Sequence, residues 1–167
     1  GAHPLPRIMA LAGAAAGGSA HDLPAMLTAL DDPDPVVRYW GASGCLSGGA
    51  AAATARERLQ RVMRADRAPQ VRVVAAEACA AFGDPAESIA VLAALAGDGE
   101  AWQVRLQALN ALTALGEAAR PALPVVEAAA ASDQEYLRNA GRYLAAVLKG
   151  EYRPDYPVFD LGRMGRA

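Results

Sequence analysis

The sequence predicts an all-α fold, an α-α superhelix of about four helical hairpins with one leading helix and an irregular C-terminal tail. Four arginines, Arg38, Arg72, Arg105 and Arg138, recur at nearly equal intervals, with a period typical of stacked helix pairs. Apolar residues recur at helical spacing within each interval, and no stretch shows the alternation of a strand. The linkers are short, as expected between antiparallel helices.

The leading helix and the first hairpin follow from periodicity and from capping residues. Residues 5–16 form the leading helix, with Ile8 and Leu11 on its apolar side. Residues 23–30 and 35–47 form the first hairpin. We expect Asp22 and Asp34 to cap the N-termini of these two helices. Gly48-Gly49 is suited to a left-handed helix end.

Three further hairpins follow the same plan. Their expected helix pairs are residues 50–65 with 69–82, 85–95 with 100–115, and 118–131 with 134–149. Residues 1–150 therefore constitute the helical repeat domain. Residues 151–167 form an extended tail, because their prolines exclude a helix. Its aromatic residues indicate that the tail lies along an apolar surface.

The copies share a pattern around each arginine. The preceding residue is always apolar, and the residue three positions later is always small: Gly41, Ala75, Ala108 and Gly141. We expect the small residues to let helices of adjacent repeats approach closely. Each copy also has an aspartate five to seven residues before its arginine: Asp32, Asp66, Asp98 and Asp133. We expect these aspartates to pair with arginines of their own or the next repeat, forming a ladder.

Composition narrows the classes of partner. Hydrophobic residues make up 53% of the 167 residues and aromatic residues 5%, which suits closely packed helices. The net charge of −2 argues against nucleic-acid binding, which requires a basic surface. No apolar run reaches the roughly 20 residues of a membrane span. The chain opens at Gly1 and its first methionine is Met9, so we expect an excised piece of a longer protein, of unassigned localisation.

The pattern of aspartate, Val-Arg, small residue and glycine over two helices resembles the HEAT repeat, an armadillo-like α solenoid. The resemblance covers residues 20–150. It implies a module for protein interaction. Some HEAT proteins resemble bilin lyases or DNA-repair glycosylases, but the acidic balance and the lack of a convergent polar cluster disfavour both enzymatic alternatives.

A narrower resemblance concerns residues 30–46, with Val37-Arg38-Tyr39-Trp40-Gly41-Ala42, the preceding Leu23-Pro24 and the segment Leu148–Tyr152. These residues resemble the helical C-terminal extension of some bacterial sulfatases. The resemblance implies a parent hydrolase whose catalytic domain precedes this module, and a periplasmic or secreted location. The sulfatase motif Cys/Ser-x-Pro-x-Arg is matched at neither Cys45 nor Cys79, so no catalytic residue is assigned.

No cofactor or metal site is expected. Cys45 and Cys79 share a register that Leu112 and Ala145 hold in the other copies, which indicates a core position. The two histidines lack the spacing of a zinc site. The aspartates before Pro35 are better explained as caps and turn residues than as calcium ligands.

Aromatic residues beside the arginines are the strongest interaction candidates. Helical geometry places Trp40 at the edge of the inward stripe of its helix and Tyr39 on the outward side. Such rings either fill gaps between repeats or anchor another protein. The predicted interaction residues are Arg38, Tyr39, Trp40, Arg72, Trp102, Arg105, Arg138, Tyr152, Tyr156 and Phe159.

The predicted function is a non-catalytic module for domain packing or protein interaction. Its partner would be the catalytic domain of its own parent, another protein, or a second copy of the chain, with no nucleic acid and no membrane. A sulfated carbohydrate on the concave face is a further alternative. The main alternative to a sulfatase extension is a free-standing HEAT scaffold.

Overall fold

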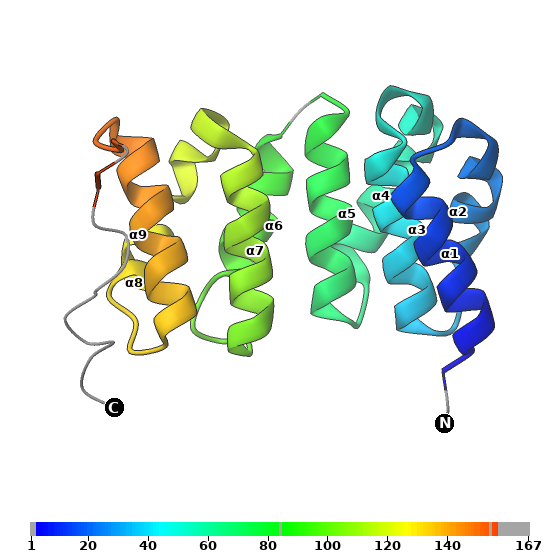
Figure 1. The fold of residues 1–167 in the computed structure, drawn as a ribbon, viewed down its shortest axis with the longest axis horizontal. Helices are drawn as coiled ribbons and strands as arrows, with labels where there is room; N and C mark the ends of the chain where they lie inside the picture. The colour runs from blue at the N-terminus through cyan, green and yellow to red at the C-terminus, as the bar shows by residue number, and fades with distance from the viewer. Residues whose placement is uncertain (1–2, 84, 154, 157–167) are drawn as a thin grey trace. The chain divides into compact units, whose positions relative to one another are not determined.

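The computed structural model describes residues 3–83, 85–153, 155 and 156. Within these residues the fold is all-α and of the helical-hairpin solenoid type, as predicted (Figure 1). Its α-helices are α1 (Leu5–Gly17), α2 (Leu23–Ala29), α3 (Pro35–Ser47), α4 (Arg56–Ala65), α5 (Pro69–Ala81), α6 (Ala86–Leu95), α7 (Trp102–Ala114), α8 (Leu123–Ala130) and α9 (Glu135–Lys149). The 3₁₀ segments are η1 (Ala20–Asp22), η2 (Gly49–Ala55) and η3 (Gly116–Ala122).

The chain divides into two compact units, with the boundary between Leu92 and Ala93 inside α6. In the first unit, α3 packs against both α1 and α5, so these three helices form one row. A second row is formed by α2, which packs on α3, and by α4, which packs on α5. In this unit, each of the hairpins α2–α3 and α4–α5 therefore places one helix in each row.

The second unit repeats this arrangement. Helix α9 packs against α7 on one side and against its hairpin partner α8 on the other. The 3₁₀ segment η3 joins α7 to α8 and contacts both, as well as α9. Leucines fill the interior of this unit, with Leu109, Leu112 and Leu144 fully buried.

The starts of two helices differ from the predictions. The segments predicted to be α-helical from residues 50 and 118 begin as η2 and η3, and the α-helices start only at Arg56 and Leu123. In η3, Pro121 lacks the N–H that a regular α-helix would use. In η2 the sequence Gly-Ala-Ala-Ala-Ala-Thr-Ala has no such residue, so the change reflects tertiary packing against α3 and α4.

Helix capping was predicted correctly at one aspartate and wrongly at the other. The Asp34 carboxylate accepts the N–H groups of Val36 and Val37 and thereby caps α3. Asp22 makes no side-chain cap, because its backbone is already helical as the last residue of η1. Gly49 has a φ of 53°, which confirms the left-handed end predicted after α3.

The small residues serve a contact other than the predicted one. A Cβ added at Gly41 would lie 3.0 Å from the Met26 carbonyl oxygen, on α2. A Cβ added at Gly141 would lie 2.8 Å from the carbonyl carbon of Ala129, on α8. Both glycines therefore admit the partner helix of their own hairpin, and the prediction that they serve the adjacent repeat is wrong for these two positions.

The described part of the tail turns back onto α9. The backbone N–H groups of Glu151 and Tyr152 both donate to the Ala146 carbonyl. The Tyr152 ring meets the ring of Tyr143 edge-on, at a centroid distance of 4.9 Å. The ring centroids of Tyr156 and Tyr152 are 6.4 Å apart. Phe159 lies outside the described residues. The division of the chain at residue 150 stays a prediction.

Both cysteines occupy the core position that their shared register predicted. Cys45 and Cys79 are buried free thiols. No helix among the described residues is long and apolar enough to cross a membrane.

Candidate interaction site

The four repeated arginines have one contact in common. Each donates to a main-chain carbonyl at or after the end of the first helix of its own hairpin. Arg38 donates to Asp32 and Pro33, Arg72 to Met63, Arg105 to Ala96, and Arg138 to Ser132 and Asp133, at 2.8 to 3.1 Å. Carbonyls at a helix C-terminus lack partners within the helix, and a cation suits the partial negative charge of that end.

Among the described residues, the predicted ladder of aspartates forms at Arg38 and Arg105. Arg38 makes a bidentate pair with Asp66 of the next repeat, with Nε–Oδ2 at 2.6 Å and Nη2–Oδ1 at 2.8 Å. Arg105 pairs with Asp98 of its own repeat at 2.6 Å. At Arg138, the aspartate Asp133 contributes its main-chain oxygen instead. The residue in register with Asp66 is Ser132, whose hydroxyl accepts the N–H of Gln134, as Asp66 accepts that of Ala68.

Burial sets the strength of the Arg38–Asp66 pair. The side chains are 16% and 5% exposed. Burial alone raises the pKa of Asp66, but the hydrogen bonds from Arg38 and from the Ala68 N–H outweigh it, and the pKa is lowered. The hydrogen bond to Asp66 in turn raises the pKa of Arg38. Arg38 therefore joins its own repeat to the next, and its guanidinium group is committed to internal contacts.

The lowered pKa of Asp66 predicts a loss of stability in acid. Its contribution is fully present above the unfolded value of 3.8 and disappears as the pH falls through the lower folded value. We expect the thermal midpoint of the native chain to fall as the pH is lowered below about 4. In the Asp66→Asn variant, which starts from a lower midpoint, this decline should be shallower. Parallel midpoint-versus-pH curves for the two proteins would contradict the assignment.

The aromatic pair in the first unit is only partly accessible. Tyr39 and Trp40 are both half-buried, and their rings meet edge-on at 5.5 Å. Both lie on α3, directly after Arg38. Much of their surface is used within the unit, so these rings favour the gap-filling interpretation more than Trp102 does. The hypothesis that they become covered in a longer parent protein stays a prediction.

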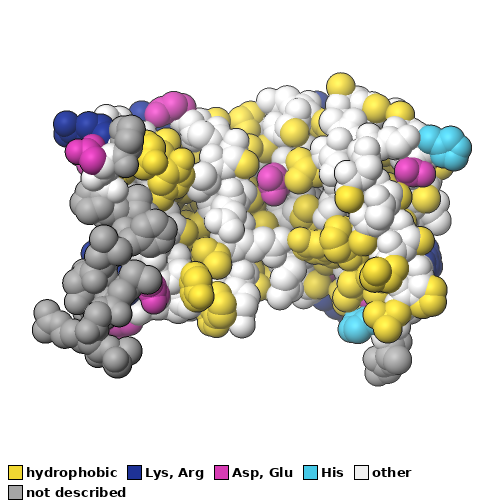
Figure 2. Space-filling view, in the orientation of Figure 1, with side chains coloured by type: hydrophobic (Ala, Val, Ile, Leu, Met, Phe, Trp, Pro, Cys, Tyr) yellow, Lys and Arg dark blue, Asp and Glu magenta, His cyan; other side chains and the backbone are white. Residues whose placement is uncertain are grey.

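The second unit presents an exposed aromatic pair. Trp102 begins α7 and Tyr136 lies in the first turn of α9. Their rings are stacked, 5.9 Å apart with planes 14° from parallel, yet they remain 40% and 62% exposed. Hydrophobic side chains are visible on the surface over these ends of α7 and α9 (Figure 2). Two large aromatic rings are thus stacked on each other and left facing solvent.

Acidic side chains dominate the sequence around this pair. Asp98, Asp133 and Glu135 are all exposed. The neighbouring guanidinium groups are largely shielded from solvent, because Arg138 is buried and the Arg105 side chain is 13% exposed. Exposed carboxylates at Asp133 and Glu135 therefore lie close in sequence to Tyr136, whereas the Asp98 carboxylate is paired with Arg105.

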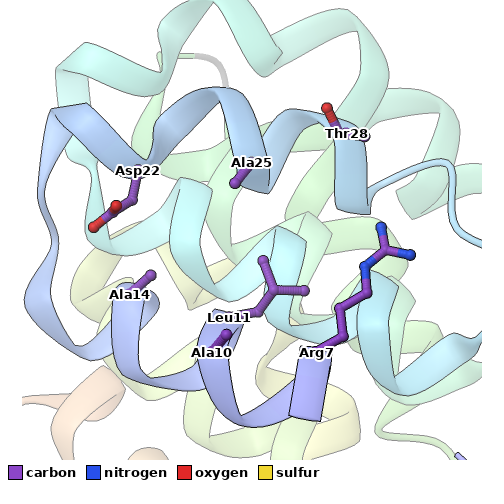
Figure 3. Close-up of a pocket in the computed structure, with 7 residues that line it drawn as sticks. All are labelled: Arg7, Ala10, Leu11, Ala14, Asp22, Ala25 and Thr28. Atoms are coloured by element: carbon purple, nitrogen blue, oxygen red, sulfur yellow. The ribbon is translucent and has the colours of Figure 1, made fainter. Parts of the chain in front are cut away.

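A pocket of about 440 Å³ lies between α1 and α2 in the first unit (Figure 3). Its lining is mostly apolar, with Arg7 at one end and Asp22 near the other. The hydroxyl of Thr28 at the rim donates to the Pro24 carbonyl 2.9 Å away. No pattern singled out this groove in the sequence.

Burial shifts the pKa values of both thiols and of one carboxylate in the described part of the chain. Burial raises the pKa of Cys45 and of Cys79 to about 11, so neither thiol is a ready nucleophile. Glu77 is a single carboxylate whose pKa is raised by burial. In residues 3–83, 85–153, 155 and 156, no group of three or more His, Cys, Asp or Glu side chains could hold a metal ion.

The structure separates the predicted site residues into two groups. Arg38, Arg72, Arg105 and Arg138 bind carbonyls inside the fold, whereas Trp102 faces solvent. Sequence reasoning missed two residues, Tyr136 and Arg7. The first stands two positions before Arg138, as an exposed aromatic in a chain with few aromatics. The second precedes Arg38 by an interval slightly shorter than those between the other arginines.

Comparison with known proteins gives one positive result. A family model described as HEAT repeats matches residues 55–145, more than half of the 167 residues. No curated protein matches the chain.

Proposed function

We propose that this chain, which belongs to the HEAT-repeat family, is a non-catalytic module. It binds another protein through the surface around Trp102 and Tyr136. The observation that carries this proposal is the stacked, exposed pair of rings at the starts of α7 and α9. Tryptophan and tyrosine are enriched among the residues that dominate binding energy. Rings that are already ordered lose little conformational entropy when a partner covers them.

The rigidity of the surroundings supports this choice. Both rings stand at helix starts, and each helix is tied to the preceding turn by a repeated arginine. The predicted role of those arginines as direct contacts is less well supported, because carbonyls and carboxylates already occupy them. Residues 1–150 would act as the repeat domain that displays this surface.

The test is removal of both rings. A Trp102→Ala, Tyr136→Ala double variant should retain its fold, because both side chains are largely outside the core. We expect it to lose at least about tenfold in the capture of a specific protein from an extract of the source organism, measured by quantitative mass spectrometry. Tyr152→Ala, which removes another exposed ring, should capture normally. Equal losses in the two variants would reject the Trp102–Tyr136 surface as the binding site.

A narrower hypothesis makes the module part of a sulfatase-like hydrolase, so that the partner is its own catalytic domain. Its support is the resemblance of residues 30–46 and 148–152 to the extensions of some bacterial sulfatases. Reading the genomic frame that encodes this chain decides between this hypothesis and a free-standing scaffold. A Cys/Ser-x-Pro-x-Arg motif upstream would indicate the hydrolase, and its absence from the complete frame would indicate the scaffold.

A further inference from the structure

Helix α1 is a further copy of the repeated second helix. When Arg7 is aligned with Arg38, Gly13 falls on Gly44 and Gly18 falls on Gly49. Gly18 and Gly49 have φ values of 60° and 53°, so both helices end in the same left-handed turn. Arg7 also pairs with Asp32, as Arg38 pairs with Asp66 of the following repeat. In sequence and in contacts, α1 therefore has the role that α3 has in the next repeat.

The two helices differ in what covers them. In α3, Gly41 and Gly44 are buried beneath α2, where Ala29 and Met26 lie against them. The equivalent residues of α1 are Ala10 and Gly13, and both are exposed. A Cβ added at Gly13 would meet nothing within 4 Å. Among residues 3–83, no helix covers this side of α1 as α2 covers α3.

The uncovered side of α1 is apolar. Leu5 and Met9 are exposed beside the small residues, and Arg7 is the single charged residue of the helix. Figure 2 shows hydrophobic side chains over the surface of α1. A helix that is apolar on all sides is normally covered on all sides. This exposure therefore calls for an occupant.

A second observation indicates what the occupant is. Arg38, Arg72, Arg105 and Arg138 each donate to carbonyls at the end of a first helix. Arg7 holds the same position, yet among the described residues it pairs with Asp32 and donates to no carbonyl. Its side chain is 49% exposed. Arg7 is thus placed to receive the C-terminal carbonyls of a helix that lies on α1.

The pocket beside α1 has matching charges at its ends. Ala10, Leu11, Ala14 and Ala25 form its apolar surface (Figure 3). Arg7 lies at one end, and Asp22 lies near the other, beside Ala14. A helix antiparallel to α1 would place its C-terminus at Arg7 and its N-terminus toward Asp22. Both charges then complement the dipole of the bound helix.

We propose that the exposed side of α1 that carries Ala10 and Gly13, at the edge of the groove between α1 and α2, binds one amphipathic helix of a partner protein, in the orientation that α2 adopts on α3. Its apolar side presents a methionine or leucine and, three positions later, an alanine, as Met26 and Ala29 do in α2. The first would lie on Gly13 and the second on Ala10. Its polar side faces solvent. This surface belongs to the first unit, so its test is independent of the aromatic pair in the second.

The probe is a synthetic peptide with the sequence of residues 19–34. Positions 24 and 28 are exposed in α2, so the peptide carries Pro24→Glu and Thr28→Lys, and condensation of these two side chains with loss of water gives a lactam that keeps it helical. Titrated into the ¹⁵N-labelled full chain, it should shift the amide signals of Ala10 and Gly13 in a saturable way. The signals of Gly41 and Gly44, which α2 already covers, should stay in place. A peptide with Met26→Asp should not bind.

A variant of the groove supplies the second measurement. Ala10→Arg puts a charged side chain on the apolar surface, and because Ala10 is exposed, the thermal midpoint should hardly change. We expect peptide affinity to fall at least about tenfold. Ala53→Arg, at an exposed alanine of the same unit, should bind normally.

Three results would overturn the proposal. The first is the absence of saturable shifts with peptide up to about 1 mM. The second is equal affinity of the native chain and the Ala10→Arg variant. The third is that the Ala10 and Gly13 signals move with protein concentration when no peptide is present, because a second copy of this chain would then occupy the groove.

Discussion

Replacing Arg38 by alanine should lower the free energy of unfolding by about 3 kcal/mol, whereas replacing Arg64 should lower it far less. The two arginines make ion pairs of nearly identical geometry. Arg38 meets Asp66 at 2.6 and 2.8 Å, and Arg64 meets Glu87 at 2.6 and 2.7 Å. They differ in burial, since the Arg64 and Glu87 side chains are 52% and 46% exposed.

The large cost at Arg38 comes from what the substitution leaves behind. The Asp66 carboxylate would stay in an almost closed environment without its cation. The carbonyls of Asp32 and Pro33 would also lose the donor that they share. Solvent replaces the lost partner easily at Glu87, because that carboxylate is already half exposed.

Urea denaturation followed by tryptophan fluorescence measures the difference. Trp40 and Trp102 are the two tryptophans of the chain, and each belongs to a different unit. In a Trp102→Phe background, Trp40 reports on the unit that contains both arginines. If Arg38→Ala and Arg64→Ala shift the midpoint equally, burial does not control the strength of these pairs.

Much of the fold could be predicted because the same residue pattern occurs in four copies along the chain. An apolar residue before the arginine and a small residue after it recur with each second helix, and each helix appears near its predicted range. The first copy, α1, was not recognised from the sequence because the chain between it and the next copy is shorter. Arg7 lies closer to Arg38 than the other repeated arginines lie to one another, so their common period does not reach it.

The candidate site was harder to predict because it depends on tertiary contacts. Trp102 was recognised as a rare aromatic near a helix start. Its partner Tyr136 lies one repeat further along the chain, and no local pattern shows that α7 and α9 bring the two rings together. The arginines were recognised as a set, but their contacts were not. Their register was evident, but whether a guanidinium faces solvent or a helix end depends on the neighbouring helix.

Gly141→Ala should be the most damaging single-methyl substitution in the second unit, with a loss of about 2–3 kcal/mol. The added Cβ would lie 2.8 Å from the Ala129 carbonyl carbon and 2.9 Å from the Ala130 Cα, and closer still to the Ala130 nitrogen. All three atoms are backbone of α8, so no side-chain rotation relieves the clash. The two helices of the hairpin must separate, and that exposes part of the packed interface between α8 and α9.

The matched control is Gly13→Ala, in the middle of α1, where an added Cβ meets no atom within 4 Å. There alanine should stabilise by about 0.5–1 kcal/mol, because it has the higher helix propensity. For Gly141→Ala, the urea midpoint is read from Trp102 fluorescence in a Trp40→Phe background. For Gly13→Ala, it is read from Trp40 fluorescence in a Trp102→Phe background. The opposite signs separate close packing from propensity. A neutral or stabilising Gly141→Ala would show that α8 and α9 do not depend on glycine for their approach.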